Sequence, residues 1–322
     1  MQLVISFETL FSENLAPLLV KALIVGLLTA VCAAILGVPL VLKRYSMIGD
    51  GLSHMGFGAL AIAAALGVSE GKQMLITMPL VVIAAVVLLL LSESGKIKGD
   101  AAIAMLSTGA VAAGYVIYSV ANKGAGDVCS SLFGTSILAL KSADVTLSVI
   151  LAVGVILIFV LLFSKIFAIT FDPAFARSAG TNASFYNILI AVLTAVTIVV
   201  GMKMIGSIMI SALIVFPELS AMRICKRFKS VITVAALLSA LNFCLGLVFS
   251  AVIQFKFGHQ VSSLPIGPCV VCFNVLTLLL CMGIKAVTDR ARGKKALAKG
   301  EKTNEKDRFD RSCGADARSL LL

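Results

Sequence analysis

The chain has 322 residues, of which 60% are hydrophobic and only 13% are charged. Ordinary soluble domains are about half apolar and about a quarter charged, so this composition excludes a typical soluble enzyme and predicts a membrane protein. The net charge of +11 does not indicate a nucleic-acid partner, because about half of the excess lies in one terminal segment. From Lys285 onward the chain has 11 Lys or Arg residues and 6 Asp or Glu residues.

The eight cysteines mostly lie within apolar runs and are interpreted as packing residues. Cys269 and Cys272 form a C-x-x-C pair, but no second pair accompanies them, so they do not predict a zinc site. The first sixteen residues include Glu8 and Glu13 and have no basic segment, which argues against a cleavable signal peptide.

Apolar runs of about 20 residues are long enough to cross the hydrocarbon core of a bilayer. The sequence predicts an all-α polytopic protein with about nine such helices, although only a short KMIG stretch separates the sixth from the seventh. The predicted spans are residues 17–42, 51–69, 74–92, 101–121, 144–168, 184–203, 206–222, 230–254 and 264–285.

Lysine and arginine are enriched in the cytoplasmic loops of membrane proteins. With the N-terminus outside, ten basic residues fall in the inner loops and five in the outer loops, which favours an N-out, C-in orientation. We therefore divide the chain into an extracytoplasmic segment (1–16), a transmembrane permease domain (17–287) and a basic cytoplasmic tail (288–322) that is expected to be disordered.

Asp50 and His54 lie four residues apart at the start of an apolar run, so a helix places them on one face. A carboxylate and an imidazole on one face are two convergent ligands for a divalent metal such as zinc or manganese. Two alternatives remain open: Asp50 as an N-cap of the helix, and His54 as a hydrogen-bonded interior histidine. The glycines at positions 49, 51, 56 and 58 are suited to close helix contacts or to leaving room for a permeant.

Glu218 is a further acidic residue within a predicted span and follows Pro217. Proline has no N–H, so the carbonyl of Leu213 loses its helical donor, and a free carbonyl beside a carboxylate is a possible ion site. The alternative, favoured from the sequence alone, is that Glu218 pairs with Arg223 about one turn away.

The stretch from residue 169 to residue 185, ITFDPAFARSAGTNASF, interrupts two apolar runs on the predicted inner side. Asp172 and Pro173 read as an N-cap and a first helical residue, and Gly180 reads as a helix stop. The pattern predicts a short cytoplasmic helix that serves as a docking surface, with Arg177 as its charged contact.

No phosphate-binding loop of the form G-x-x-x-x-G-K-[ST] occurs in the sequence. Any ATP-driven work therefore needs another subunit to hydrolyse ATP, and the chain itself is not expected to be an enzyme or to bind a cofactor.

Four stretches together resemble the membrane permease of zinc- and manganese-type ATP-binding-cassette importers, the ABC-3 family. They are LGVPLVLKRYSMIGDGLSHMGFGALAIA (36–63), SLFGTSILALKSAD (131–144), FDPAFARSAG (171–180) and MKMIGSIMISALIVFPELSA (202–221). The resemblance covers most of residues 17–285. The chain departs from the family where Glu218 and Leu219 follow the proline, because family members often have small residues there.

The resemblance implies a homodimer in the bacterial cytoplasmic membrane, with a central translocation path, two cytoplasmic ATPase subunits and an extracytoplasmic metal-binding protein. It implies that Asp172, Pro173, Arg177 and Gly180 form the coupling helix that docks on the ATPase. It also associates Asp50 and His54 with the metal path. Glu218, where the chain departs from the family, is either a local variation or an extra ligand, and is the weaker candidate.

The transported metal is expected to be zinc. Manganese and iron stay open as alternatives, because one imidazole and one carboxylate do not distinguish between these metals. A proton-coupled secondary transporter would also use acidic and histidine residues within its spans. An ABC permease for a larger substrate, such as a siderophore or a vitamin, would share the architecture without needing the Asp50–His54 pair.

Overall fold

The computed structural model describes residues 2–5, 16–43, 45, 47–68, 72–93, 99–120, 142–257 and 260–290. The described residues divide into two compact units, and the boundary between them falls after Leu278. The helices are α1 (Ala16–Leu42), α2 (Ile48–Ala65), α3 (Gln73–Glu93), α4 (Gly99–Val120), α6 (Ser142–Leu161), α7 (Phe163–Phe171), α8 (Pro173–Ser178), α9 (Ala183–Ile205), α10 (Ser207–Ile224), α11 (Phe228–Val252) and a final helix, Ile266–Arg290.

Each of the nine predicted spans coincides with a helix or a helix pair in the described part of the chain. Seven single helices there are long and apolar enough to cross a membrane, and the bent pair α6 and α7 makes an eighth candidate. The remaining predicted span, residues 51–69, corresponds to α2, which carries Asp50 and His54 and is not among these candidates. The predicted class of α-helical multi-pass membrane protein is confirmed, while the number of spans and their orientation stay predictions.

Two of the predicted boundaries need comment. The predicted span 144–168 is broken at Leu162, where the helix axis turns by 67° between α6 and α7. Between the sixth and seventh spans a single residue, Gly206, separates α9 from α10 with a φ of 96°, a conformation that glycine adopts without steric cost.

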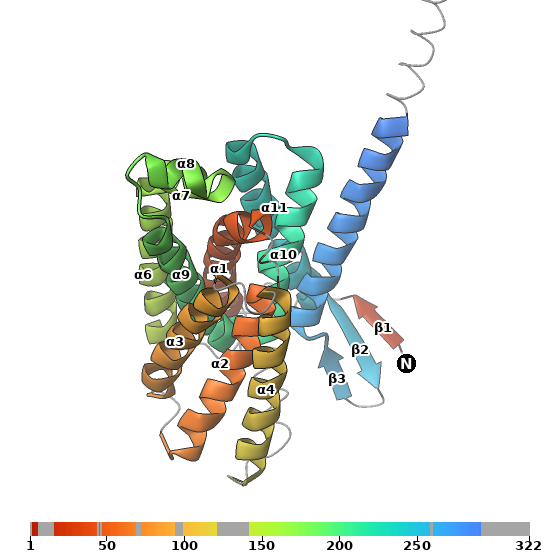
Figure 1. Cartoon of the computed structure of the whole chain (residues 1–322). Coiled ribbons are helices and arrows are strands. Elements are labelled where there is room, and N and C mark those ends of the chain that lie inside the picture. The colour runs from red at the N-terminus through yellow and green to blue at the C-terminus, as the bar shows by residue number, and fades with distance from the viewer. Residues whose placement is uncertain are drawn as a thin grey trace, which may run out of the picture. The chain divides into compact units, whose positions relative to one another are not determined.

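A small antiparallel sheet, which the sequence did not predict, accompanies the helices. Its strands are β1 (Gln2–Ile5), β2 (Ile253–Phe257) and β3 (Gln260–Ser263), in the order β1-β2-β3 (Figure 1). Ile5 pairs with Ile253, and Phe257 pairs with Gln260. Backbone groups outside a helix need partners, and here the start of the chain finds them more than 240 residues away, which no local pattern reveals.

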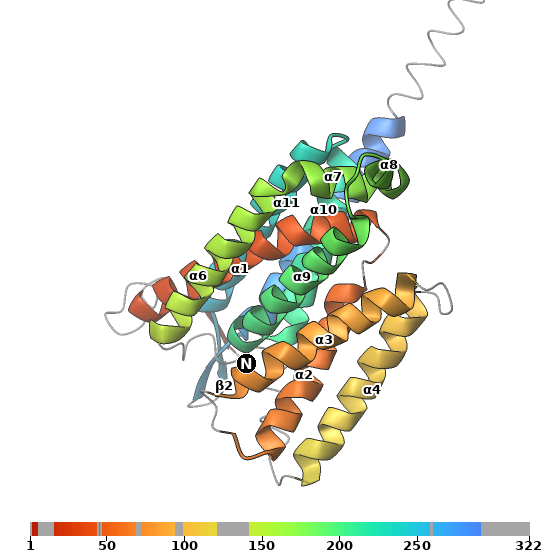
Figure 2. The same ribbon diagram turned by 60° about the vertical axis from the view of Figure 1, so that its left-hand side comes forward.

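The core of the first unit lies where α1, α2, α9 and α10 pack together. Buried apolar side chains from these helices, such as Leu36, Leu52, Ile198 and Leu213, belong to one continuous cluster. Figure 2 shows α2, α3 and α4 as neighbouring helices, and α2 contacts both of the others. Large apolar side chains such as Leu157 of α6 face outward, as expected for a surface solvated by lipid rather than water.

The close contact between α1 and α10 depends on Gly37. A Cβ atom added at this position would lie 2.4 Å from the carbonyl oxygen of Ile214 and 2.6 Å from Oε1 of Glu218. Because one of these neighbours is backbone, the helices would have to move apart to accept a side chain.

We predict that Gly37→Ala lowers the free energy of unfolding by about 1–3 kcal/mol, the usual cost of overpacking a core. Thermal unfolding of the purified protein in detergent measures this change. Gly154→Ala in α6 is the matched control, because no atom lies within 4 Å of its added Cβ. Alanine there is expected to be neutral or stabilising, since it favours helix over glycine by about 1 kcal/mol. Equal melting temperatures for Gly37→Ala and the wild type would contradict the prediction.

Candidate metal site and coupling helix

The predicted pair Asp50 and His54 lies together on the first two turns of α2. Oδ1 of Asp50 is 3.5 Å from Nε2 of His54, and the side chains are 45% and 26% exposed respectively. A carboxylate and an imidazole therefore share one accessible face, as the four-residue spacing predicts.

The interpretation of Asp50 as an N-cap is wrong. Helix α2 begins at Ile48, its N-cap residue is Met47, and no side chain accepts a capping hydrogen bond there. Asp50 instead lies within the first turn, where its negative charge interacts favourably with the positive end of the helix dipole. Its backbone carbonyl accepts a hydrogen bond of 2.8 Å from Oγ of Ser53, while its carboxylate points along the helix to His54.

The alternative of a hydrogen-bonded interior histidine does not hold for His54. Its Nδ1 atom is buried and has no hydrogen-bond partner among the residues that the structure describes. Its Nε2 atom faces Asp50. A neutral imidazole has one nitrogen with a free lone pair, which can accept a hydrogen bond or bind a metal.

Glycines let α2 pack closely against its neighbours, while the Asp50 and His54 side chains stay partly exposed. An added Cβ at Gly51 would lie 2.6 Å from the Ile103 side chain of α4, and one at Gly58 would lie 2.8 Å from the Ala110 carbonyl oxygen. These contacts support the close-packing interpretation of the glycines, because small residues let membrane helices approach each other.

Glu218 does not pair with Arg223, so that sequence interpretation is wrong. The Glu218 side chain is fully buried, and neither carboxyl oxygen has a hydrogen-bond partner within the described residues. Arg223 is exposed. The carboxyl group of Glu218 lies over Gly37 of α1, in the space that a side chain at that position would fill.

Glu218 also stands apart from the Asp50–His54 pair. In the part of the chain that the structure describes, no three His, Cys, Asp or Glu side chains lie close enough to bind one metal ion. One chain thus contributes two neighbouring candidate ligands, and Glu218 is not a third ligand at the same position.

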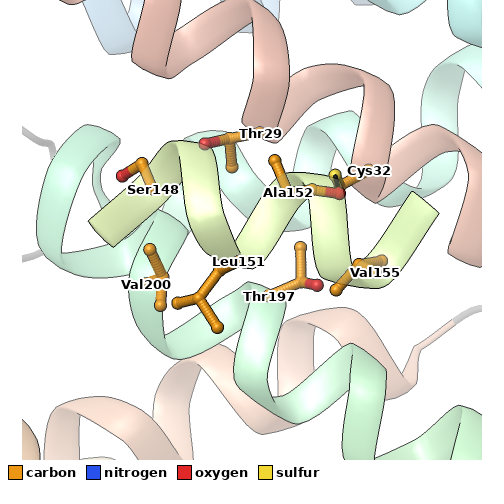
Figure 3. Close-up of a pocket in the computed structure, with 8 residues that line it drawn as sticks. All are labelled: Thr29, Cys32, Ser148, Leu151, Ala152, Val155, Thr197 and Val200. Atoms are coloured by element: carbon orange, nitrogen blue, oxygen red, sulfur yellow. Dashed lines mark hydrogen bonds between the residues drawn. The ribbon is translucent and has the colours of Figure 1, made fainter. Parts of the chain in front are cut away.

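A small cavity between α1, α6 and α9 is separate from these residues (Figure 3). Its polar lining comes from Thr29, Cys32, Ser148 and Thr197, and the rest is apolar. None of the predicted metal ligands lines it, so it is not a candidate for the metal path.

The predicted short helix is present as α8, with the predicted ends. The Asp172 side chain accepts a hydrogen bond of 2.8 Å from the Phe175 N–H, and Pro173 is the first helical residue. At the other end Gly180 has a φ of 75°. Its N–H donates to the carbonyl of Arg177, and the N–H of Thr181 donates to the carbonyl of Ala176, which together form a Schellman motif.

Helix α8 presents nearly its whole surface for contact. Ala176 is its buried residue, packed with Ile169 of α7 and Ala183 of α9, whereas Arg177 is exposed. Phe175 is 66% exposed, and the sequence analysis did not single it out. A large apolar side chain that faces away from the core of a short capped helix was the signal that could have identified it.

Comparison with known proteins places these features in a family. Residues 16–285 match the ABC 3 transport family. The chain is 30% identical over 227 residues to the manganese import system permease protein ScaB of Streptococcus gordonii, covering 70% of this chain and 80% of that protein. It is 30% identical over 294 residues to the chelated iron transport system membrane protein YfeD of Yersinia pestis, covering 88% and 92% respectively.

A solved structure of PsaBC from Streptococcus pneumoniae in complex with Fab contains a similar chain. The TM-score is 0.69 at 25% sequence identity, and the match covers 82% of this chain and 90% of that one. Because the family match extends from residue 16 to residue 285 and the fold agrees with a solved relative, the resemblance noted in the sequence is confirmed. The chain belongs to the ABC 3 transport family and is a multi-pass transport component of the bacterial cytoplasmic membrane.

Proposed function

We propose that this chain is the permease subunit of an ATP-binding-cassette importer for a divalent transition metal. The observation that carries the proposal is the accessible Asp50–His54 pair on α2, in which the buried Nδ1 of His54 has no other partner in the described chain. Ionisable side chains within membrane segments are costly and usually mark the path of an ion.

Manganese or iron is the proposed cargo, in place of the zinc expected from the sequence. The relatives described above are named for manganese and for chelated iron, and no zinc transporter is among them. A carboxylate oxygen with one imidazole is a ligand set that manganese and iron accept as well as zinc does.

The proposed path lies between two copies of the chain. Asp50 and His54 supply two ligands, fewer than a divalent transition metal normally takes from its surroundings. A two-fold related copy would bring a second pair to the same axis. Glu218 is enclosed between α1 and α10, so a ligand role for it, which stays a prediction, would require these helices to separate.

The proposed partners follow from the missing phosphate-binding loop and from α8. Two cytoplasmic ATPase subunits would hydrolyse ATP and dock on α8 through Phe175 and Arg177, with Asp172, Pro173 and Gly180 fixing its ends. An extracytoplasmic metal-binding protein would deliver the ion. This arrangement retains the proposed N-out, C-in permease domain of residues 17–287, flanked by the segments 1–16 and 288–322; most of the latter lies outside the described residues.

We predict that Asp50→Asn and His54→Ala each reduce manganese uptake by at least about tenfold, which corresponds to about 1.4 kcal/mol of lost ligand interaction. Asparagine keeps the size of the side chain but removes the negative charge, and alanine is the best helix former. Uptake is measured in metal-starved cells at matched expression.

Thr233→Ala is the control for these two variants. Its hydroxyl is exposed on α11 and bonds to the carbonyl of Lys229 within the same helix, so the change should leave uptake intact. Undiminished transport by Asp50→Asn would reduce this carboxylate to a structural role.

The identity of the metal is tested by competition. We predict that unlabelled manganese or iron suppresses uptake of radiolabelled manganese through this chain at concentrations at which zinc has little effect. Cells that lack the chain give the background. Suppression by zinc at lower concentrations than manganese would restore the zinc assignment.

A further prediction concerns the coupling helix. Phe175→Ala and Arg177→Glu should each weaken association with the ATPase by about tenfold or more, because truncating a central aromatic or arginine contact commonly costs over 1 kcal/mol. Co-purification and binding in detergent measure the effect. Phe249→Ala removes a comparable exposed ring from the far end of α11 and should leave the association unchanged. Normal ATPase binding by both α8 variants would contradict the proposal that this helix is the docking site.

A further inference from the structure

Four phenylalanine rings join the coupling segment to the start of α11. Phe228, the first residue of α11, has its ring centre 5.5 Å from that of Phe163, 5.3 Å from that of Phe167 and 5.6 Å from that of Phe171, all on α7. The rings of Phe167 and Phe171 lie 4.9 Å apart. We call these four residues the aromatic cluster. Such ring distances are those at which aromatic pairs attract each other.

The aromatic cluster lies where the coupling helix meets the transmembrane helices. Figure 1 and Figure 2 both place α7 and α8 at the end of the first unit where α10 passes into α11. The next residue along, Lys229, adds a second contact, because its Nζ lies 5.7 Å from the ring centre of Phe163.

Phe228 is the member of the aromatic cluster that reaches into the transmembrane core. It is 7% exposed and belongs to a buried group that includes Ala34 and Val38 of α1 and Ala221 of α10. The rings of Phe167 and Phe171, by contrast, are exposed. Phe228 therefore connects α7 on one side with α1 and α10 on the other.

The same stretches of α1 and α10 lead to the proposed metal ligands. Gly37, next to Val38, packs against the carbonyl oxygen of Ile214 on α10. The side chain of Ile214 in turn approaches Gly49, where an added Cβ would lie 3.2 Å away, and Gly49 precedes Asp50 in α2. Packed contacts, together with the neighbouring pairs Gly37–Val38 and Gly49–Asp50 in the chain, thus join the aromatic cluster to the Asp50–His54 pair.

At its other end the aromatic cluster is joined firmly to α8. Phe171 is the last residue of α7, and Asp172 immediately caps α8. Ile169 of α7 packs against Ala176 of α8 in a small buried cluster. Because α7 and α8 share this contact and a one-residue connection, a force applied to α8 reaches the phenylalanines of α7.

We propose that Phe228 is a positioning residue that transmits movement of the coupling helix α8 to α1 and α10, and through them to the Asp50–His54 pair. The proposal rests on the proposed function and deepens it, by naming the contact through which ATP hydrolysis would reach the metal path. Close-packed side chains transmit displacement because they have few voids in which to relax. The quantity that tests the coupling is the amount of metal transported per ATP hydrolysed.

The test uses the complete transporter, with its ATPase, in proteoliposomes. In Phe228→Leu the buried apolar side chain is kept but the ring contacts with α7 are lost. We expect normal co-purification of the ATPase, because α8 is unaltered, and continued ATP hydrolysis. Manganese transported per ATP hydrolysed should fall by about fivefold or more, the lower range of allosteric coupling.

Phe249→Leu is the matched control. Phe249 also lies on α11 and packs edge-on against one ring, that of Phe273 at 5.4 Å, but it is not part of the aromatic cluster. Its replacement removes an aromatic contact of the same kind and should leave the ratio of transport to hydrolysis unchanged. Phe228→Tyr, which keeps the ring, should restore the ratio to at least half of the wild-type value.

The possible outcomes distinguish failure of the coupling role of Phe228 from failure of the proposed function on which it rests. If the wild-type transporter imports no manganese or iron, the proposed function fails. If the wild type transports metal and Phe228→Leu has an unchanged ratio of transport to hydrolysis, the coupling role of Phe228 is overturned. A parallel loss of ATPase binding, hydrolysis and transport in Phe228→Leu, together with a lower melting temperature, would also overturn it, because that pattern describes a purely structural residue.

Discussion

The constraint on which this structure depends is that lipid offers no partner for a polar group. Backbone groups are satisfied within helices, and most hydroxyl groups bond to a carbonyl one turn earlier, as Thr29, Thr194 and Thr197 do. Asn242 of α11 donates to Oδ1 of Asn274 in the final helix, Asn274 donates to the carbonyl of Val270, and Thr277 donates to Oδ1 of Asn242. Against this background a buried polar atom without a partner is costly.

Two of the exceptions, His54 and Glu218, are ionisable, and their surroundings differ. The His54 side chain lies on a partly exposed helix face with Nε2 beside the Asp50 carboxylate, although its unpartnered Nδ1 is buried. Glu218 is equally unpartnered, but Gly37 and the α1–α10 contact enclose it. Part of the His54 side chain is therefore exposed, whereas Glu218 is fully buried and would become accessible only if α1 and α10 separated.

Hydropathy predicted the long helices well because a helix that crosses lipid needs a continuous apolar run. Helix α8 was predicted in detail because the residues that start and stop it are close together in the sequence. The Asp172 cap, Pro173 and Gly180 all lie within nine residues and act only on their own helix. The predictions that failed depended on distant residues or on a boundary. Pairing of β1 with β2 joins residues 2–5 to residues 253–257, Arg223 is exposed while Glu218 is buried, and α2 begins two residues before Asp50. The close packing of α2 on α4 through Gly51 and Gly58 likewise depends on Ile103 and Ala110, about 50 residues away, which the spacing of the glycines alone does not reveal.

The contact between α7 and α11 consists of packed aromatic rings, which suits the movement proposed for α7. Hydrogen bonds between membrane helices contribute only about 0.6 kcal/mol on average, since the separated helices find other partners. A hydrogen-bonded link at this position would therefore resist displacement weakly. Here the link is instead made by four packed rings, and three of them, those of Phe163, Phe167 and Phe171, lie on α7, which turns by 67° from α6. In the proposed coupling, α7 would swing about the break at Leu162 while its rings keep contact with Phe228, and a rotation at the ATPase would become a displacement of α1 and α10.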